Sequence, residues 1–174
     1  MQEYWDLLLP DGTPTGEVMP ATQRIPDDRC TLVVHIFIAD QHGRFLLQKR
    51  SMKKKYFPGI WDSTGGRVLA GETGEDAIIR EAFEEVGLTI EKDQLHYIDR
   101  YKLPWRNFFD VYCTKADFVL EDCRKQDEEV DELRLVPYEE AVAMIRASKP
   151  ESSENYYFEA FEKAAHILGI LGDI

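Results

Sequence analysis

The stretch from Gly65 to Leu88 constrains this chain more than any other part of its sequence. Two adjacent glycines precede a segment that is rich in acidic and helix-forming residues. At about 100° per residue, a helix over 76–86 would bring Glu81, Glu84 and Glu85 into an arc of roughly 100°. Four apolar residues occupy another arc, which we expect to pack inward: Ile79, Ala82, Phe83 and Val86. The sequence therefore predicts an amphipathic helix with a crowded acidic face.

The acidic face needs a positive partner. Like charges three or four residues apart destabilise a helix by on the order of a few tenths of a kcal/mol per pair. Mg²⁺ prefers a few carboxylate oxygens together with water and substrate phosphate, so Mg²⁺, or Mn²⁺ in its place, is the natural counterion. Arg80 lies beside Glu84 on the helix, and we expect it to steady the acids without binding the metal. The alternative is a solvated helix face with one internal ion pair.

The glycines around this helix fit a binding site. Gly87 suits the helix end, where a residue in the left-handed conformation stops the last turn. Gly65 and Gly66 carry no side chain, so their backbone is able to approach an ion or a phosphate closely. A solvated helix face alone leaves these glycines, Glu72 and Arg80 unexplained at their spacings.

Gly66, Glu72 and the run Arg80–Leu88 follow the pattern G-x5-E-x7-R-E-U-x-E-E-x-G-U, where U is aliphatic. The stretch resembles the Nudix box, and its one soft departure is the small Ala82 at the first U. The resemblance implies an α/β fold in which a mixed β-sheet is sandwiched between helices, an α/β/α sandwich. It also implies a hydrolase of nucleoside diphosphates linked to another moiety. The metal ligands that it implies are the carbonyl of Gly65 and the carboxylates of Glu81, Glu84 and Glu85.

In the Nudix family a further acid downstream often completes the site or acts as a base. Glu129 stands where that acid is usually found, six residues before Leu135, and Glu128 and Glu132 are close rivals. A solvated acidic turn is the alternative explanation for this run. The catalytic set that the resemblance implies is Arg80, Glu81, Glu84, Glu85 and Glu129.

Basic and aromatic residues precede the box. Lys49 and Arg50 end a strand-like run, and either could reach a phosphate. Several aromatic side chains could stack on a base or simply pack: Tyr56, Phe57, Trp61 and Trp105. We expect His35, inside an apolar strand, to be a core residue rather than a ligand. The expected substrate-binding residues are Lys49, Arg50, Trp61 and Gly66.

The rest of the chain alternates between strand and helix patterns. Residues 4–23 read as a hairpin, so we divide the chain into an N-terminal β-hairpin extension (1–28) packed on a Nudix hydrolase domain (29–174). Thr31–Ala39 is apolar and rich in β-branched residues, which predicts a central strand buried on both faces. Residues 44–50 are expected to be its hairpin partner. Further strands are expected at 95–103, 108–120 and 130–136, and helices at 137–147 and 154–168.

Charge and composition limit the partners. The net charge of −12 and the pI near 4.8 argue against a nucleic-acid polymer or an anionic membrane. No apolar run reaches the ~18 residues needed to span a bilayer. Three cysteines without a C-x-x-C spacing indicate reduced thiols and a cytoplasmic protein. We expect a small diphosphate substrate as the partner, and we leave a homodimer open.

A second resemblance is to the isopentenyl-diphosphate isomerase branch of the superfamily. It rests on residues 3–6, 32–35 and 48–50. Those isomerases use a catalytic cysteine and metal-binding histidines just upstream of the box, where residues 61–66 (WDSTGG) offer neither. We therefore expect a hydrolase on an isomerase-like frame. The alternatives are an isomerase and a non-catalytic Nudix-fold binding module, although such modules usually lose the box glutamates that this chain retains.

Overall fold

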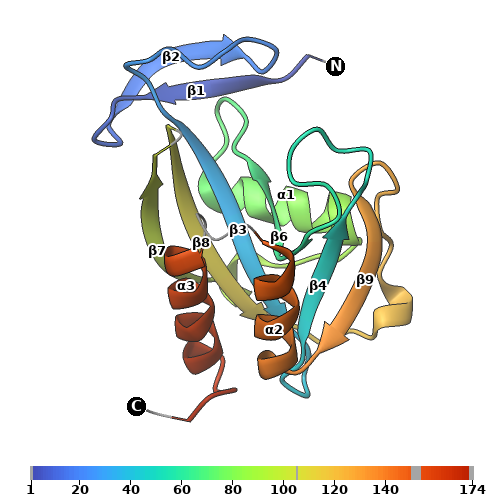
Figure 1. Cartoon of the computed structure of the whole chain (residues 1–174). Helices are drawn as coiled ribbons and strands as arrows, with labels where there is room; N and C mark the ends of the chain where they lie inside the picture. The colour runs from blue at the N-terminus through green and yellow to red at the C-terminus, as the bar shows by residue number, and fades with distance from the viewer. Residues whose placement is uncertain (1, 105, 150–153, 173–174) are drawn as a thin grey trace.

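The computed structural model describes residues 2–104, 106–149 and 154–172, so Trp105 lies outside the described residues. Its centre is a seven-stranded mixed sheet with one helix on one face and two on the other (Figure 1). The expected α/β/α sandwich is confirmed. The strands are β1 (Tyr4–Leu8), β2 (Pro14–Pro20), β3 (Thr31–Ala39), β4 (Phe45–Arg50), β5 (Trp61–Asp62), β6 (Thr64–Arg67), β7 (His96–Leu103), β8 (Asn107–Lys115) and β9 (Val130–Val136). The α-helices are α1 (Gly74–Val86), α2 (Tyr138–Ser148) and α3 (Glu154–Ile167).

Strand β3 is the central strand that the sequence predicts. It pairs in parallel with β8 along its whole length, and on its other edge it pairs antiparallel with β6, His35 opposite Gly65. The expected hairpin with β4 is wrong for most of its length, because β4 meets β3 only where Ala39 faces Phe45. Strand β6 occupies the rest of that edge, and β4 pairs with β5 and β9 instead.

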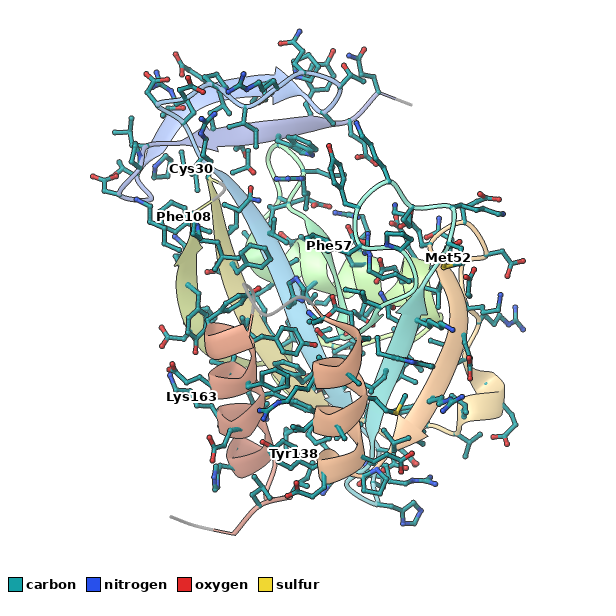
Figure 2. The ribbon with its side chains drawn as sticks, viewed as in Figure 1. Cys30, Met52, Phe57, Phe108, Tyr138 and Lys163 are labelled. Carbon is teal, nitrogen blue, oxygen red and sulfur yellow. The ribbon has the colours of Figure 1, made fainter. Side chains whose placement is uncertain are left out.

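The sheet separates two apolar cores, which side chains fill on both faces (Figure 2). Phe37 of β3 faces α2 and α3, where the Phe161 ring lies with its centroid 4.5 Å from that of Phe37 and 4.7 Å from that of Phe45. Ile36, the next residue along β3, faces α1 and packs with Ile78. This alternation follows from the two-residue period of a strand and fixes which face each β3 side chain serves.

Helix α1 begins at a capping box that the sequence analysis missed. The Thr73 hydroxyl accepts from the Asp76 amide, and the Asp76 carboxylate accepts from the Thr73 amide. The helix ends, as expected, at Gly87 with a φ of 74°. Phe83 is 62% exposed, so its predicted place on the inward face is wrong. The buried residues are Ala77, Ile78, Ala82, Glu85 and Val86, an arc that includes part of the acidic face.

The N-terminal hairpin, strands β1 and β2, forms its own two-stranded sheet above one end of the main sheet (Figure 1). Leu8, Cys30 and Phe108 form a small apolar cluster where it meets that sheet (Figure 2). Two hydrogen bonds tie β1 to the loop after β6: the Ala70 amide donates to the Tyr4 carbonyl at 2.8 Å, and the Gly71 amide to Asp6 Oδ2 at 2.9 Å. The hairpin therefore braces the loop that leads into α1.

Some predicted boundaries shift. Strand β8 ends at Lys115, five residues before the predicted end, and a 3₁₀ turn follows at Leu120–Asp122. The stripe along α3 is core as expected, with Tyr157, Phe161 and Ala165 buried. None of the described helices has the length and apolar character needed to cross a membrane.

We expect Phe161→Ala to lower the free energy of unfolding by roughly 3–5 kcal/mol, because it leaves a cavity among three rings on one core face. Urea unfolding followed by circular dichroism measures this change. Phe83→Ala is the matched control and should stay within about 0.5 kcal/mol of the parent, because that ring is exposed. Equal losses for the two variants would contradict this account of the core.

Candidate functional site

Arg80 links the acidic face of α1 to the loop before it. Its Nε donates to Glu72 Oε1 at 2.7 Å, and its Nη1 donates to Glu81 Oε1 at 2.8 Å and to Glu84 Oε2 at 3.3 Å. Its Nη2 donates to the carbonyl of Arg67 at 3.1 Å. Glu72 in turn accepts from the backbone amide of its own loop. The spacing of Glu72 and Arg80 is thus explained by one guanidinium that fastens the loop to the helix.

Glu85 lies deepest in the site, with 4% of its surface exposed. Its Oε2 accepts from Gln48 Nε2 at 2.9 Å and from the Gly65 amide at 3.3 Å. Burial, followed by the negative charge of Glu81, raises the pKa of Glu85 to about 8. Burial also raises the pKa of Glu81, although Arg80 opposes this shift. The ionised form of both carboxylates is therefore destabilised when no cation is bound.

The two glycines of β6 are required by close packing on both of its faces. A Cβ atom added to Gly66 would lie 2.2 Å from Glu81 Oε1, and one added to Gly65 would lie 2.4 Å from the carbonyl oxygen of Val34. Neither distance is sterically allowed. Glycine is therefore the residue that lets the Glu81 carboxylate rest against the backbone of β6.

The three candidate downstream acids differ in what they face. Glu129 forms an ion pair with Lys54 at 2.5 Å, and its charge also acts on Glu81 and Glu85. Glu128 instead pairs with an exposed lysine, Lys53. Glu132 is paired with Arg134 at 2.7 Å on the surface of β9. The geometry therefore brings Glu129, and neither of its two rivals, toward the acids of α1.

The carboxylates suit a hard divalent cation. Within the described residues, no three acidic, histidine or cysteine side chains already surround one point as a metal site would. Arg80 and Lys54 instead hold the carboxylates of Glu81, Glu84 and Glu129 in ion pairs. Buried oxygen donors whose raised pKa values report unfavourable negative charge are the donors that Mg²⁺ or Mn²⁺ would stabilise. The residues present therefore fit such a cation.

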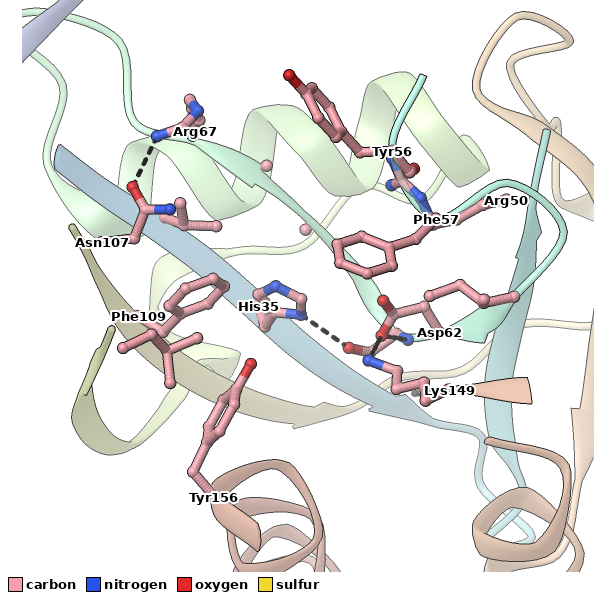
Figure 3. Close-up of a pocket in the computed structure, with 16 residues that line it drawn as sticks. His35, Arg50, Tyr56, Phe57, Asp62, Arg67, Asn107, Phe109, Lys149 and Tyr156 are labelled. Atoms are coloured by element: carbon pink, nitrogen blue, oxygen red, sulfur yellow. Dashed lines mark hydrogen bonds and ion pairs between the residues drawn. The ribbon is translucent and has the colours of Figure 1, made fainter. Parts of the chain in front are cut away.

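A pocket of about 510 Å³ opens beside β6 (Figure 3). Of the sequence-predicted residues, Arg50, Gly65 and Gly66 line it, together with the aromatic Tyr56 and Phe57. Lys49 and Trp61 are not among its lining residues. The same two glycines thus contact the acids of α1 and line the pocket.

Trp61 takes another place because of its strand pairing. Its backbone lies opposite Lys49 in the β4–β5 ladder, and its ring packs on the α2–α3 core with the Arg134 guanidinium 5.0 Å from its centroid. Its amide donates to Ser148 Oγ at 2.9 Å. This arrangement is that of a packed tryptophan rather than of a ring free to stack on a base.

The pocket floor is polar, and apart from His35, which was expected to be a core residue, its groups were not among the predicted site residues. His35 Nδ1 lies 3.2 Å from Ser63 Oγ, and burial lowers the pKa of His35 to about 4, so the ring is neutral (Figure 3). Lys149 Nζ donates to Asp62 Oδ1 at 2.9 Å. Burial opposes ionisation of Asp62 and is the largest single influence, but the charge and hydrogen bond of Lys149, together with smaller contributions that include a hydrogen bond from Tyr157, outweigh it and lower the pKa of Asp62. The floor therefore carries a neutral imidazole beside a compensated ion pair.

The sequence indicates some of these pocket residues better than others. His35 is buried against Phe109, ring centroids 5.2 Å apart, as a core residue would be, yet it also lines the pocket. The glycine pair is flanked by Asp62, Ser63 and Arg67. This position beside the glycines is the sequence feature that could have indicated that they line the pocket. Lys149 comes from the end of α2, and nothing local in the sequence links it to the pocket.

Comparisons with known proteins place the chain in a family. A model of the NUDIX domain matches residues 31–158, and the chain belongs to the Nudix family. An uncharacterized Nudix hydrolase of Listeria monocytogenes is 34% identical over 143 residues, which are 82% of this chain and 84% of that protein. The domain match and this relative support a hydrolase that acts on diphosphate bonds.

Two further similarities are to an enzyme and to a solved structure. The isopentenyl-diphosphate Delta-isomerase of Escherichia coli is 33% identical over 102 residues, 58% of this chain and 56% of that enzyme. The crystal structure of DR0079 from Deinococcus radiodurans superposes with a TM-score of 0.72, covering 93% of this chain and 99% of that one at 24% identity. The second similarity supports the fold.

We expect the metal-free protein to lose stability as pH rises through about 8. The pKa of Glu85 is about 8 in the folded chain and 4.5 in its ordinary state, so the folded state holds the extra proton in between. The stabilisation is complete below pH 4.5 and disappears as the pH passes about 8. In a chelating buffer, the melting temperature of the parent should fall on the order of 5 °C more between pH 6 and pH 9 than that of Glu85→Gln.

Glu75→Gln is the matched control for this titration, because Glu75 is an exposed acid on the same helix. Its melting temperature should follow the parent at every pH. A Glu85→Gln variant that shows the same pH dependence as the parent would contradict the assignment.

Proposed function

We propose that this protein is a Mg²⁺-dependent hydrolase, able to use Mn²⁺ in its place, that cleaves the diphosphate bond of a nucleoside diphosphate linked to another moiety, or of a related small diphosphate. The observation that carries the proposal is that buried Glu85 and the more exposed Glu81 and Glu129 act on one another beside the two glycines of β6, which also line a pocket of ligand size. A diphosphate that lies along the two glycines would therefore lie beside both the pocket residues and the acids.

Within this proposal, Glu81, Glu84, Glu85 and the Gly65 carbonyl would hold the metal. A bound divalent cation would supply neutralisation of the diphosphate charge and a lower pKa for the attacking water. Arg80 positions the carboxylates through the contacts that it already makes with Glu81 and Glu84. These assignments follow the Nudix box residue by residue.

Glu129 and Arg50 complete the proposed machinery. Glu129 lies close enough for its charge to act on both Glu81 and Glu85. We therefore assign Glu129 as the base that accepts the proton of the attacking water. In this proposal, substrate binding releases Glu129 from its ion pair with Lys54. Arg50 lines the pocket and binds a phosphate oxygen. Free thiols at Cys30, Cys113 and Cys123 suit a reducing cytoplasm.

We expect Glu85→Gln to reduce Mg²⁺-dependent release of phosphate or nucleotide by on the order of 10²-fold or more, because it removes a charged ligand without changing size. The measurement is turnover across nucleoside triphosphates, dinucleoside polyphosphates, nucleotide sugars, coenzyme A and prenyl diphosphates. Mg²⁺ should also raise the melting temperature of the parent but not of the variant.

Glu75→Gln again serves as the control and should retain parental activity. Activity of Glu85→Gln within twofold of the parent would rule out the proposed mechanism. A parent that binds no divalent cation and cleaves none of these compounds would favour the non-catalytic binding module.

The positions of the thiols bear on the isomerase alternative. An isomerase of this branch needs a thiol at the pocket to protonate a carbon–carbon double bond. None of the described pocket-lining residues is a cysteine. Cys113 lies in the apolar core, where burial raises its pKa to about 12, and Cys30 is buried beneath the N-terminal hairpin. This placement of the thiols supports the hydrolase over the isomerase.

We expect no isomerisation of isopentenyl diphosphate, even with Mg²⁺ and Zn²⁺ present. Ser63 and Thr64, the hydroxyl groups before the glycines, are too weakly acidic to protonate an alkene near neutral pH. The test is to incubate the purified protein with isopentenyl diphosphate and to follow the allylic isomer by NMR. Formation of that isomer in proportion to the protein, and its loss in Glu85→Gln, would establish the isomerase instead.

A further inference from the structure

Arg67 is a pocket-lining cation that has no counterion among the described residues. It directly follows the two glycines of β6 and is half-buried. Its Nη1 donates to Thr31 Oγ1 and, at 3.0 Å, to Asn107 Oδ1, and both acceptors are neutral (Figure 3). In the part of the chain that the structure describes, no carboxylate pairs with Arg67. A shielded guanidinium of this kind is costly unless an anion joins it.

The N-terminal hairpin holds this guanidinium in place. The carbon at the centre of the Arg67 guanidinium lies 4.3 Å from the centroid of the Trp5 ring. Strand β1, which carries Trp5, is fastened to the loop after β6 at Ala70 and Gly71. Trp5 Nε1 is buried and has no partner among the described residues. Arg67 is therefore packed against an aromatic wall that belongs to the hairpin.

The other charged groups of the pocket do not neutralise the positive charge of Arg67. Lys149 is paired with Asp62, and His35 is neutral. Among the described residues, the Arg50 guanidinium donates one hydrogen bond, to the Tyr56 carbonyl, and its buried Nε has no partner. Arg50 and Arg67 lie on opposite sides of the pocket (Figure 3). The pocket is thus positively charged in a chain whose net charge is −12.

We propose that Arg67 binds a phosphate group of the substrate from the pocket side of β6, and that Trp5 is the residue that positions it. The inference rests on the proposed function, since the ligand is a phosphate of that substrate. It makes the N-terminal hairpin, which lies outside the matched residues 31–158, part of the substrate site. The phosphate is either one of the scissile diphosphate or a further one on the attached moiety.

A structural role is the alternative for both residues. Arg67 would then serve to link Thr31 and Asn107, and Trp5 to cover them. The two roles separate in measurement, because a structural residue changes the melting temperature without changing the affinity for an anion. Binding of inorganic diphosphate is the direct probe, since it requires no turnover and is measurable in a chelator at low ionic strength.

The test is calorimetric titration of the whole chain with inorganic diphosphate in a chelator. Arg67→Gln should raise the dissociation constant by about tenfold or more through loss of a charge-assisted contact. Arg67→Lys, which keeps the charge without the planar fork, should fall between this variant and the parent. Trp5→Leu should raise the dissociation constant about threefold, and Trp5→Phe, which keeps an aromatic face, should restore it.

Arg146→Gln is the matched control. The Arg146 guanidinium stacks on Phe158 at 4.6 Å in the same kind of contact, but it lies outside the pocket. This variant should bind inorganic diphosphate as the parent does. Equal affinity of the parent and Arg67→Gln, or no binding by the parent, would overturn the proposal, whatever the protein hydrolyses.

Steady-state kinetics then identify the source of the phosphate. With Mg²⁺, Arg67→Gln should raise KM and leave kcat within a few-fold of the parent. A rise for substrates whose only phosphates are the scissile pair assigns Arg67 to that diphosphate. A rise confined to substrates with an additional phosphate assigns Arg67 to the outer group. Unchanged KM for every substrate that is cleaved would also overturn the proposal.

Discussion

The close approach of α1 to β6 at Gly66 is the constraint on which the site depends. Any side chain at this position would overlap the Glu81 carboxylate, which would have to turn away. A Cβ atom at Gly65 would lie 2.4 Å from the backbone carbonyl oxygen of Val34, so β6 itself would have to move and its Gly65 amide would leave Glu85. The two missing Cβ atoms therefore let the acids of α1 lie against the backbone of β6.

Burial of these acids makes their negative charge unfavourable in the metal-free site. Glu85 is held by two neutral donors, and the charged partners of the site, Arg80 and Lys54, pair with the more exposed carboxylates around it. The positive charges at the pocket lie across β6 from this negative cluster. The backbone of a single strand thus separates an anionic side, suited to a cation, from a cationic side, suited to phosphate.

Sequence patterns predicted the parts of the fold that depend on local periodicity. The apolar run of β3 and the spacing of the acids on α1 specified a central strand and a helix, and the resemblance to the Nudix family implied the layers. The outward position of Phe83, the partner of β4 and the place of Trp61 were not predicted, because they depend on tertiary arrangement. Phe83 depends on how α1 docks, β4 on the pairing of β6 with β3, and Trp61 on the pairing of β5 with β4. Lys149 and Asn107 meet at the pocket from distant segments, and no local pattern connects them. Glu129 stood out only through its distance from the box.

The way in which the N-terminal hairpin is attached has an evolutionary consequence. It is one contiguous segment that ends before β3, it forms its own sheet, and it meets the box loop through a few backbone contacts and one tryptophan. Recombination or drift in this short segment would reshape one wall of the pocket while leaving every box residue untouched. Relatives with identical boxes are then free to diverge in substrate preference through their first thirty or so residues.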